Sequence, residues 1–338
     1  LGGLVVIHEL GHFITARLSR VRVLEFGIGF PPRAKVLASG GETLYTLNWL
    51  PIGGFVKLEG EDGTDADDPR SFAHQGLLKK LTILIAGVAM NVFLAFVIFT
   101  GIAWLASPFV GVKFFEVQPA SPAAAAGLQP GESIVAVDGQ RYQFITGPTP
   151  LGALREHAGE TITLTIAGAD GQRRDVPVTL RPQAEIDANK GALGISGVDK
   201  PFEAYFFGEY TTNDLPAAIQ VGADQTIRWM GLIVGGLASL VTSVANDPTA
   251  PPPVSGPVGI ATQIGDIFWN SGPIMTLYVA GILSANLAVV NILPFPPLDG
   301  GRMLMLTLKR SFGTRISLRA EQMTYVVGFV FLFAFIIW

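Results

Sequence analysis

The sequence of 338 residues contains no cysteine, and only 15% of its residues are charged. Without cysteine there is no disulfide framework, no thiolate metal ligand and no cysteine nucleophile. Soluble proteins carry about 25% charged residues, so the low charge argues against an ordinary soluble enzyme and against a disordered chain. The 23 basic and 27 acidic residues give a net charge of −4, which argues against a nucleic-acid-binding protein. Hydrophobic residues instead reach 49%, as in a membrane protein.

The hydrophobic residues are concentrated in long runs without charge. Residues 81–112 and 267–298 contain no Asp, Glu, Lys or Arg, and residues 322–338 form a shorter run of the same kind. A helix needs about 20 mostly apolar residues to cross a bilayer, so we predict a span in each run. Residues 1–16 are expected to be the remaining part of a first span, truncated or processed at its start. The predicted fold is a polytopic α-helical membrane protein with about four transmembrane helices.

A segment of different composition separates the second and third predicted spans. Short runs of alternating apolar and polar residues, bounded by Gly and Asp-Gly, predict strands and hairpins in this segment, with one short capped helix. The expected domains are the first half of a membrane core at 1–110, an inserted α+β domain at 111–198, a helical and linker region at 199–253, and the second half of the core at 254–338.

The distribution of basic residues predicts which segments face the cytoplasm. Residues 17–80 contain nine Lys or Arg and residues 299–321 contain five, whereas the nine in residues 107–272 are outweighed by 16 acidic residues. The positive-inside rule places the first two segments in the cytoplasm. The inserted domain is therefore expected on the outer side.

The residues His8-Glu9-Leu10-Gly11-His12 match the pattern H-E-x-x-H. Positions i and i+4 share one face of a helix, so both imidazoles can bind one zinc ion. The glutamate between them can then take a proton from zinc-bound water. The alternative is a pair of core histidines bonded to backbone carbonyls. Ionisable residues at membrane depth are costly and usually mark function, which favours the zinc site.

A catalytic zinc site needs a third protein ligand, and Asp299 at the end of the third predicted span is the candidate. The alternative is that Asp299 only caps the helix that follows it. Pro294, Pro296 and Pro297 are expected to break the third helix beside the zinc.

The same ligand set decides how a fifth apolar run, residues 229–246, is interpreted. The run is long enough to cross a bilayer, but a span there would place His12 and Asp299 at opposite membrane faces. We therefore predict an interfacial or packed helix at 229–246. His74 and His157 are expected to be surface residues.

Four motifs carry a resemblance to a known family: HELGH at 8–12, GVAMN at 87–91, SGPVGI at 255–260 and NILPFPPLDGG at 291–301. In this order, over nearly the whole chain, they resemble the site-2 protease family of intramembrane zinc metalloproteases, and within it the bacterial regulator-of-sigma-E protease type. The resemblance implies that His8, His12 and Asp299 bind one zinc ion and that Glu9 is the catalytic general base and acid.

The resemblance also implies that the inserted domain is a PDZ domain and that residues 23–57 form a membrane-associated β-hairpin, to which substrate adds as a strand. Family members of this type often carry two PDZ domains, whereas the insert accommodates one. Gly53 and Gly54 would let a substrate backbone approach closely, or are ordinary turn residues. Asn291 resembles the family asparagine that contacts substrate. Asn91 is either a related substrate contact or forms an interhelical hydrogen bond.

The resulting hypothesis is a zinc-dependent endopeptidase that cleaves within or near transmembrane segments in regulated intramembrane proteolysis. The expected partners are the lipid bilayer, single-span membrane proteins such as anti-sigma factors or signal-peptide remnants, and peptide or protein termini at the PDZ domain. The expected location is the bacterial inner (cytoplasmic) membrane, with the active site near the cytoplasmic side and the PDZ domain extracytoplasmic. The rival hypotheses are a zinc-binding membrane transporter or sensor, which would not need Glu9, and an inactive PDZ scaffold.

Overall fold

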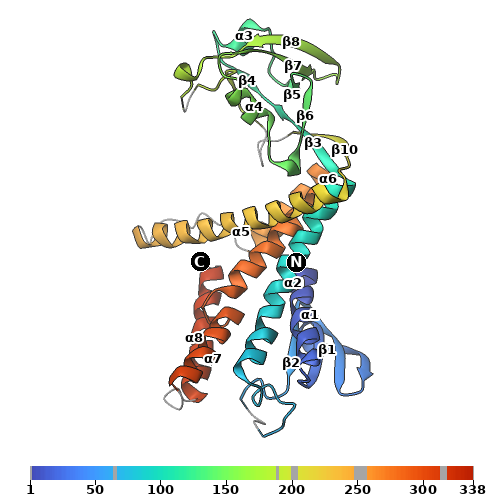
Figure 1. Ribbon diagram of the computed structural model, residues 1–338, viewed down its shortest axis with the longest axis vertical. Helices are drawn as coiled ribbons and strands as arrows, with labels where there is room; N and C mark the ends of the chain where they lie inside the picture. The colour runs from blue at the N-terminus through green and yellow to red at the C-terminus, as the bar shows by residue number, and fades with distance from the viewer. Residues whose placement is uncertain are drawn as a thin grey trace. The chain divides into compact units, whose positions relative to one another are not determined.

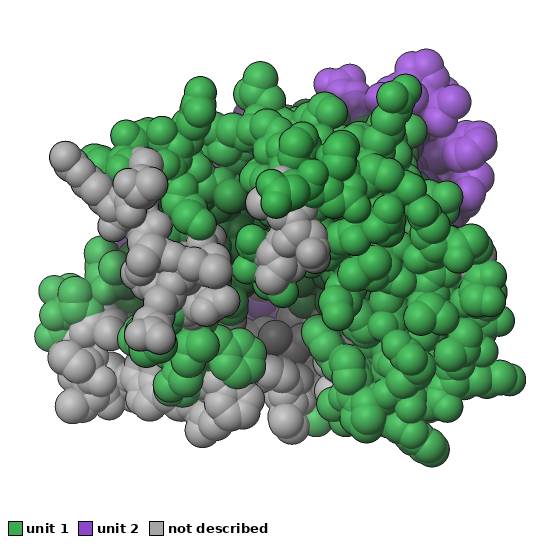
Figure 2. Space-filling view, turned by 90° about the horizontal axis from the view of Figure 1, so that it is seen from below, with its two compact units in different colours: residues 1–99, 222–338 green, residues 100–221 purple. Residues whose placement is uncertain are grey.

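The computed structural model describes residues 2–63, 67–187, 190–198, 205–246, 257–312 and 318–337. Its contacts divide the chain into two compact units, shown in green and purple in Figure 2. Unit 1 comprises residues 1–99 and 222–338, and unit 2 comprises residues 100–221. The linker expected at the end of the region 199–253 and the first two residues of the motif at 255–260 lie outside the described residues.

Unit 1 is built mainly from helices (Figure 1), two of which extend past its boundaries at residues 99 and 222. These helices are α1 (Gly2–Leu18), α2 (Leu77–Leu105), α5 (Leu215–Asn246), α6 (Pro257–Ile292), α7 (Asp299–Phe312) and α8 (Leu318–Ile337). The helix α6 is interrupted at Gly272, whose φ of 80° and ψ of −179° are not helical, directly before Pro273. It ends at Ile292, two residues before Pro294, as expected because proline cannot continue a regular helix. The predicted break of the third span is therefore confirmed.

Three helices in the described part of the chain have the length and hydropathy to cross a membrane: Leu77–Leu105, Leu215–Ser243 and Gly272–Ile292. The first and third coincide with two of the predicted spans. The second contains residues 229–246, where an interfacial or packed helix was predicted. In Figure 1, α5 runs across α2 and α6 rather than alongside them. The interfacial placement of this helix and the number of spans remain predictions.

A small β-sheet packs against α1 in the region predicted as a hairpin. Its two long strands are β1 (Val23–Gly40) and β2 (Thr43–Leu58). Each strand folds back on itself, so that residues 23–28 pair on one side with residues 54–58 and on the other with residues 44–47. Gly53, with φ of 81°, makes one of these reversals, because such a backbone conformation favours glycine. The last part of β2 is therefore an outer strand of this sheet.

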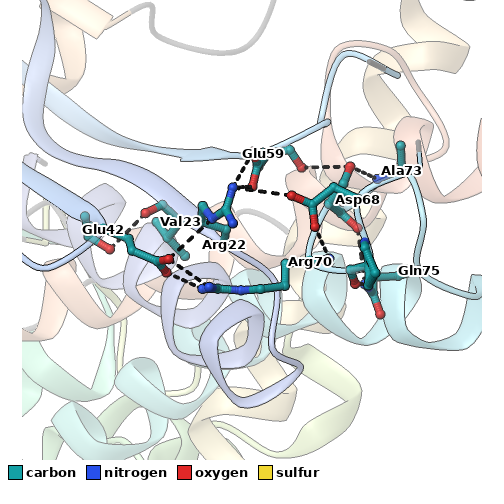
Figure 3. Close-up of polar contacts among 11 residues, drawn as sticks. Arg22, Val23, Glu42, Glu59, Asp68, Arg70, Ala73 and Gln75 are labelled. Atoms are coloured by element: carbon teal, nitrogen blue, oxygen red, sulfur yellow. Dashed lines mark hydrogen bonds and ion pairs between the residues drawn. The ribbon is translucent and has the colours of Figure 1, made fainter. Parts of the chain in front are cut away.

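A network of charged residues joins the base of this sheet to the segment that follows it (Figure 3). Arg22 Nη1 donates to Glu59 at 2.6 Å and lies 3.4 Å from Asp68 Oδ2. Arg70 Nη1 donates to Glu42 Oε1 at 2.8 Å, and Glu42 lies in the turn between the two strands. The network therefore holds the α1–β1 connection, the turn, Glu59 and residues 68–70 together.

Unit 2 is an α+β unit with its own apolar core, which includes Ile134, Leu164, Ile166 and Val178. Its strands are β3 (Ser107–Lys113), β4 (Glu116–Val117), β5 (Ser133–Val137), β6 (Gln140–Gln143), β7 (Thr161–Ala167), β8 (Arg173–Thr179), β9 (Ile195–Ser196) and β10 (Tyr205–Thr211). Its helices are α3 (Pro122–Ala125) and α4 (Pro150–Glu156), with short 3-10 helices at Phe144–Thr146 and Gln183–Glu185.

Six of these strands form one sheet in the order β10-β3-β6-β5-β7-β8, and β4 pairs with β9 in a second sheet. The pairing of β10 with β3 is antiparallel, from Tyr205 opposite Gly111 to Thr211 opposite Ser107. Unit 2 is therefore wider than the predicted insert at 111–198. The predicted helical and linker region contains the strand β10 as well as the helix α5, and the four-part domain division remains a prediction.

Candidate metal centre

The helix α1 places His8 and His12 one turn apart on one face, as the i, i+4 spacing predicts. Both side chains are buried, with 5% and 6% of their surface exposed. The two Nε2 atoms lie 3.1 Å apart, and the rings meet edge to face at 83°. Two imidazole nitrogens therefore point to the same place inside unit 1.

Asp299 brings a carboxylate to the same place from the other end of the sequence. Its Oδ2 lies 2.9 Å from His8 Nε2 and 3.3 Å from His12 Nε2. Asp299 is also the first residue of α7, so the expected helix start is present, but the side chain faces the two histidines. The tight return of the chain depends on Gly300, where a Cβ would lie 2.1 Å from the carbonyl oxygen of Ile292.

The helix α2 supports both histidines through three positions about one turn apart, Ile83, Gly87 and Asn91. His12 Nδ1 lies 2.8 Å from the carbonyl oxygen of Ile83, and since a carbonyl only accepts, Nδ1 carries the proton. His8 Nδ1 lies 3.2 Å from the amide nitrogen of Asn91. A Cβ on Gly87 would lie 2.4 Å from His12 Nε2 and 2.8 Å from His8 Cε1. Only glycine therefore leaves room for both rings at this position.

These side chains fit a zinc ion. Zinc is bound by neutral histidine nitrogen and by carboxylate oxygen, with three protein ligands in catalytic sites. Here two Nε2 atoms and one Oδ2 atom converge within 3.3 Å. The bond from His12 Nδ1 to the carbonyl of Ile83 leaves the lone pair of Nε2 free for a metal. We therefore assign His8, His12 and Asp299 as the candidate ligands.

Glu9 lies beside the candidate ligands but is not on the face of α1 that carries His8 and His12. Its carboxylate and the ligating nitrogens of His8 and His12 all lie within 4.8 Å of one another. Glu9 Oε2 accepts a hydrogen bond from the backbone N–H of Val56 at 3.1 Å. A cavity of about 190 Å³ is lined by Glu9, His12 and Asp299, and by Gly54, Val56 and Arg302 among others. The outer strand of the sheet therefore borders the candidate site.

The predicted substrate-binding residues occupy different places. Gly54 lines the cavity, and a Cβ on Gly53 would meet Phe30 and Val5 at 3.1 and 3.2 Å. Asn291 is half-buried in the last turn of α6. Asn91 is fully buried against His8, which agrees with the alternative that it forms an interhelical hydrogen bond. Contact of these four residues with substrate remains a prediction.

Sequence reasoning missed two interactions next to the site. One is the hydrogen bond from Val56 to Glu9, which no side-chain pattern could signal because a backbone group donates it. The other is the ion pair between Arg302 Nη1 and Glu61 Oε1 at 2.6 Å. The spacing of Arg302, three residues after Asp299 on a helix, could have indicated that Arg302 lies on the same face as Asp299, but not that Glu61 is its partner.

The other two histidines are not part of the cluster of His8, Glu9 and His12 in the described part of the chain. His74 is exposed, and His157 Nδ1 pairs with Glu160 Oε2 at 2.8 Å in unit 2. That hydrogen bond raises the pKa of His157 above its usual value. The expectation that both are surface residues agrees with these positions.

Comparison with known proteins bears on the same motifs. The model of "Peptidase family M50" matches residues 1–335. A provisionally named zinc metalloprotease of Clostridium acetobutylicum is 32% identical over 336 residues, covering 98% of this chain and 91% of the relative. The zinc metalloprotease RasP of Geobacillus kaustophilus is 28% identical over 414 residues, covering 98% and 92%. These matches give no support to a transporter, a sensor or an inactive scaffold. The chain belongs to peptidase family M50, the site-2 protease family, as its motifs predicted.

Proposed function

We propose that the protein is a zinc-dependent endopeptidase that hydrolyses a peptide bond within or near transmembrane segments of membrane proteins. The observation that carries the proposal is the convergence of His8 Nε2, His12 Nε2 and Asp299 Oδ2 within 3.3 Å, beside the carboxylate of Glu9. When bound there, zinc supplies Lewis acidity toward a peptide carbonyl and lowers the pKa of water.

Glu9 is the general base and then the general acid. Its carboxylate takes a proton from the attacking water, whose oxygen adds to the carbonyl carbon of the scissile bond. Glu9 then gives the proton to the nitrogen of the leaving amine as the C–N bond breaks. Two features support this role: the position of Glu9 next to the histidines and the hydrogen bond from Val56, which holds one carboxylate oxygen in place.

The substrate binds as an added strand along residues 54–58. Among the described residues, this segment pairs with residues 23–28 along one side, and the Val56 N–H points away from that pairing, toward Glu9. An exposed strand edge binds an extended peptide through main-chain hydrogen bonds. A substrate helix therefore unwinds locally before its carbonyls become accessible. Gly53, Gly54 and Asn291 are proposed to contact the unwound segment, in line with the resemblance of this region to that of site-2 proteases.

The protein is a multi-pass protein of a bacterial inner (cytoplasmic) membrane with about four spans. The excess of Lys and Arg in residues 17–80 and 299–321 supports a cytoplasmic position for the active-site end. Unit 2 is proposed to be an extracytoplasmic PDZ domain that binds peptide or protein termini. Single-span anti-sigma factors and signal-peptide remnants are the proposed substrates, cleaved in regulated intramembrane proteolysis. The course of α5 across α2 and α6 supports a helix lying in the membrane interface.

The test compares the purified wild type with the variant Glu9→Gln on a tagged single-span substrate, with and without a chelator. We expect the wild type to bind one zinc ion and to lose cleavage when the chelator removes it. Glu9→Gln is expected to keep the zinc and to lose cleavage, because glutamine cannot take up the proton. Glu185→Gln, an exposed residue of unit 2, is the matched control and should cleave as the wild type does. Equal cleavage in all samples would overturn the proposal.

A further inference from the structure

Asn91 is a buried polar residue whose contacts point to a role at the metal site other than substrate contact. It lies on α2 one turn after Gly87, and no part of it is exposed. Its amide nitrogen lies 3.2 Å from His8 Nδ1. Its amide oxygen is buried and has no hydrogen-bond partner among the described residues. The hydroxyl of Ser284 on α6 donates to the backbone oxygen of Asn91 at 2.9 Å, which fixes this turn of α2.

The state of His8 Nδ1 decides whether His8 can bind a metal. A neutral imidazole carries its proton on one nitrogen only, and the other nitrogen is the acceptor or metal ligand. A ligand that binds through Nε2 therefore carries its proton on Nδ1 and needs an acceptor there. For His12 that acceptor is the carbonyl oxygen of Ile83, which can accept a hydrogen bond but cannot donate one. For His8 the group at Nδ1 is the amide of Asn91.

An amide can serve either form of His8, because it carries a donor and an acceptor on opposite sides. With its nitrogen toward Nδ1, it suits a ring that carries the proton on Nε2 and donates it to Asp299 Oδ2 at 2.9 Å. A half-turn of the amide brings the oxygen, which has no partner now, to Nδ1. In the present orientation the amide oxygen has no hydrogen-bond partner among the described residues, so the requirement of His8 decides which way the amide turns.

We propose that Asn91 is a positioning residue that sets the tautomer of His8. Its amide oxygen accepts a hydrogen bond from Nδ1–H when Nε2 binds zinc, and rotation of the amide accommodates the other tautomer when Nε2 pairs with Asp299. The inference rests on the zinc site of the proposed function. It also accounts for the G-x-x-x-N spacing of residues 87–91: Gly87 makes room for both rings, and one turn later Asn91 holds the far nitrogen of His8.

Two substitutions at Asn91 separate this role from packing. Asn91→Leu keeps the approximate volume but has no acceptor, and we expect zinc affinity to fall about 10- to 100-fold, as for other partners of histidine ligands. Asn91→Asp offers only an acceptor, so it favours the metal-binding tautomer, and we expect zinc affinity at or above that of the wild type. Asn286→Leu is the matched control, because it removes another asparagine amide from an apolar helix, at a half-buried position of α6, and should leave zinc affinity unchanged.

The measurements are zinc affinity by chelator competition and the ¹⁵N spectrum of the histidine side chains in the zinc-loaded protein. The chain has four histidines and no cysteine, so the signals of His8 and His12 can be assigned against those of His74 and His157. We expect His8 to carry its proton on Nδ1 in the wild type and in Asn91→Asp. In Asn91→Leu we expect the Nδ1–H signal of His8 to lose its hydrogen-bonded shift, while that of His12 stays.

Zinc uptake by the wild type is measured first, and a wild type that binds no zinc would overturn the proposed zinc site itself. Given a zinc-binding wild type, wild-type affinity and an unchanged His8 signal in Asn91→Leu would overturn the role of Asn91. An equal loss of affinity in Asn286→Leu would do the same, because it would show a general effect of packing. If Asn91→Leu does not fold, Asn91→Asp decides, since weaker zinc binding by a carboxylate at this position would contradict the proposal.

Discussion

Gly87 offers a test of the site that depends on a steric clash rather than on lost chemistry. In the variant Gly87→Ala the new methyl group would lie 2.4 Å from His12 Nε2, 2.6 Å from His12 Cε1 and 2.8 Å from His8 Cε1. Ordinary contact at such a carbon begins at 3.4 Å. The His12 ring or the helix α2 therefore has to move by about 1 Å.

The cost of that movement can be worked out from what holds His12. The ring is tied to the carbonyl of Ile83 by a hydrogen bond of 2.8 Å, worth about 0.5–1.5 kcal/mol net. Overpacking of a closely packed interior costs about 1–3 kcal/mol, while alanine is favoured over glycine within a helix by about 1 kcal/mol. We expect a net loss of folding stability of about 1–3 kcal/mol.

Zinc binding is expected to suffer as well, because a metal site tolerates ligand displacements of only about 0.2 Å. We expect zinc affinity to fall about 100-fold and cleavage to fall with it at limiting zinc. The assay is chelator competition on the purified protein, followed by cleavage of a tagged single-span substrate over a zinc titration. Gly101→Ala is the control, since Gly101 lies on the same helix and a Cβ there meets nothing within 4 Å.

The reasoning would be refuted if Gly87→Ala bound zinc as tightly as the wild type while Gly101→Ala also behaved normally. An equal loss of zinc in both variants would contradict it as well, because the cause would then be the added methyl group in α2 and not its contact with the rings.

Two further predictions concern ion pairs of unit 1. Arg302→Glu is expected to lower kcat/KM, because Arg302 and Glu61 join the segment after β2 to α7. The double variant Arg302→Glu, Glu61→Arg should restore part of the lost kcat/KM, with a coupling energy of about 1 kcal/mol in a double-mutant cycle. Strictly additive effects of the two substitutions would contradict this. The hydrogen bond from Arg70 holds the pKa of Glu42 below its usual value of 4.5, so this pair stabilises the fold above the unfolded pKa and stops doing so as the pH falls through the folded pKa. Glu42→Gln should therefore lower the apparent Tm at neutral pH and have no effect in strong acid, whereas the same difference at both would rule out the ion pair as its cause.

Much of the site could be predicted because its parts are local. The i, i+4 spacing of His8 and His12 fixes their common face as soon as the segment is a helix, and α1 is a helix over Gly2–Leu18. The prolines after Ile292 end α6 by their chemistry alone. Even the pairing of Asp299 with His8, across 291 positions of sequence, could be anticipated, because a catalytic metal needs a third ligand of a restricted type.

The contacts that refine the site were beyond prediction from sequence. The fold-back of β1 and β2 depends on which segments pair, and an alternating pattern is compatible with several registers. The hydrogen bond from Val56 to Glu9 involves a backbone N–H, which every residue except proline possesses. The acceptor at Nδ1 of His12 is a backbone carbonyl for the same reason.

The sequence by itself determined the candidate metal ligands of this protein, because the spacing of His8 and His12 follows from helix geometry and the choice of Asp299 from ligand preference. Only the tertiary structure decided how α2 serves the site, with Gly87 admitting two rings and Asn91 facing His8 Nδ1. It also decided that the edge of residues 54–58 turned away from residues 23–28 faces Glu9, whose carboxylate accepts from the Val56 N–H. The physical reason is that these contacts join segments far apart in the chain, whose approach depends on packing and on backbone groups that carry no residue-specific signal.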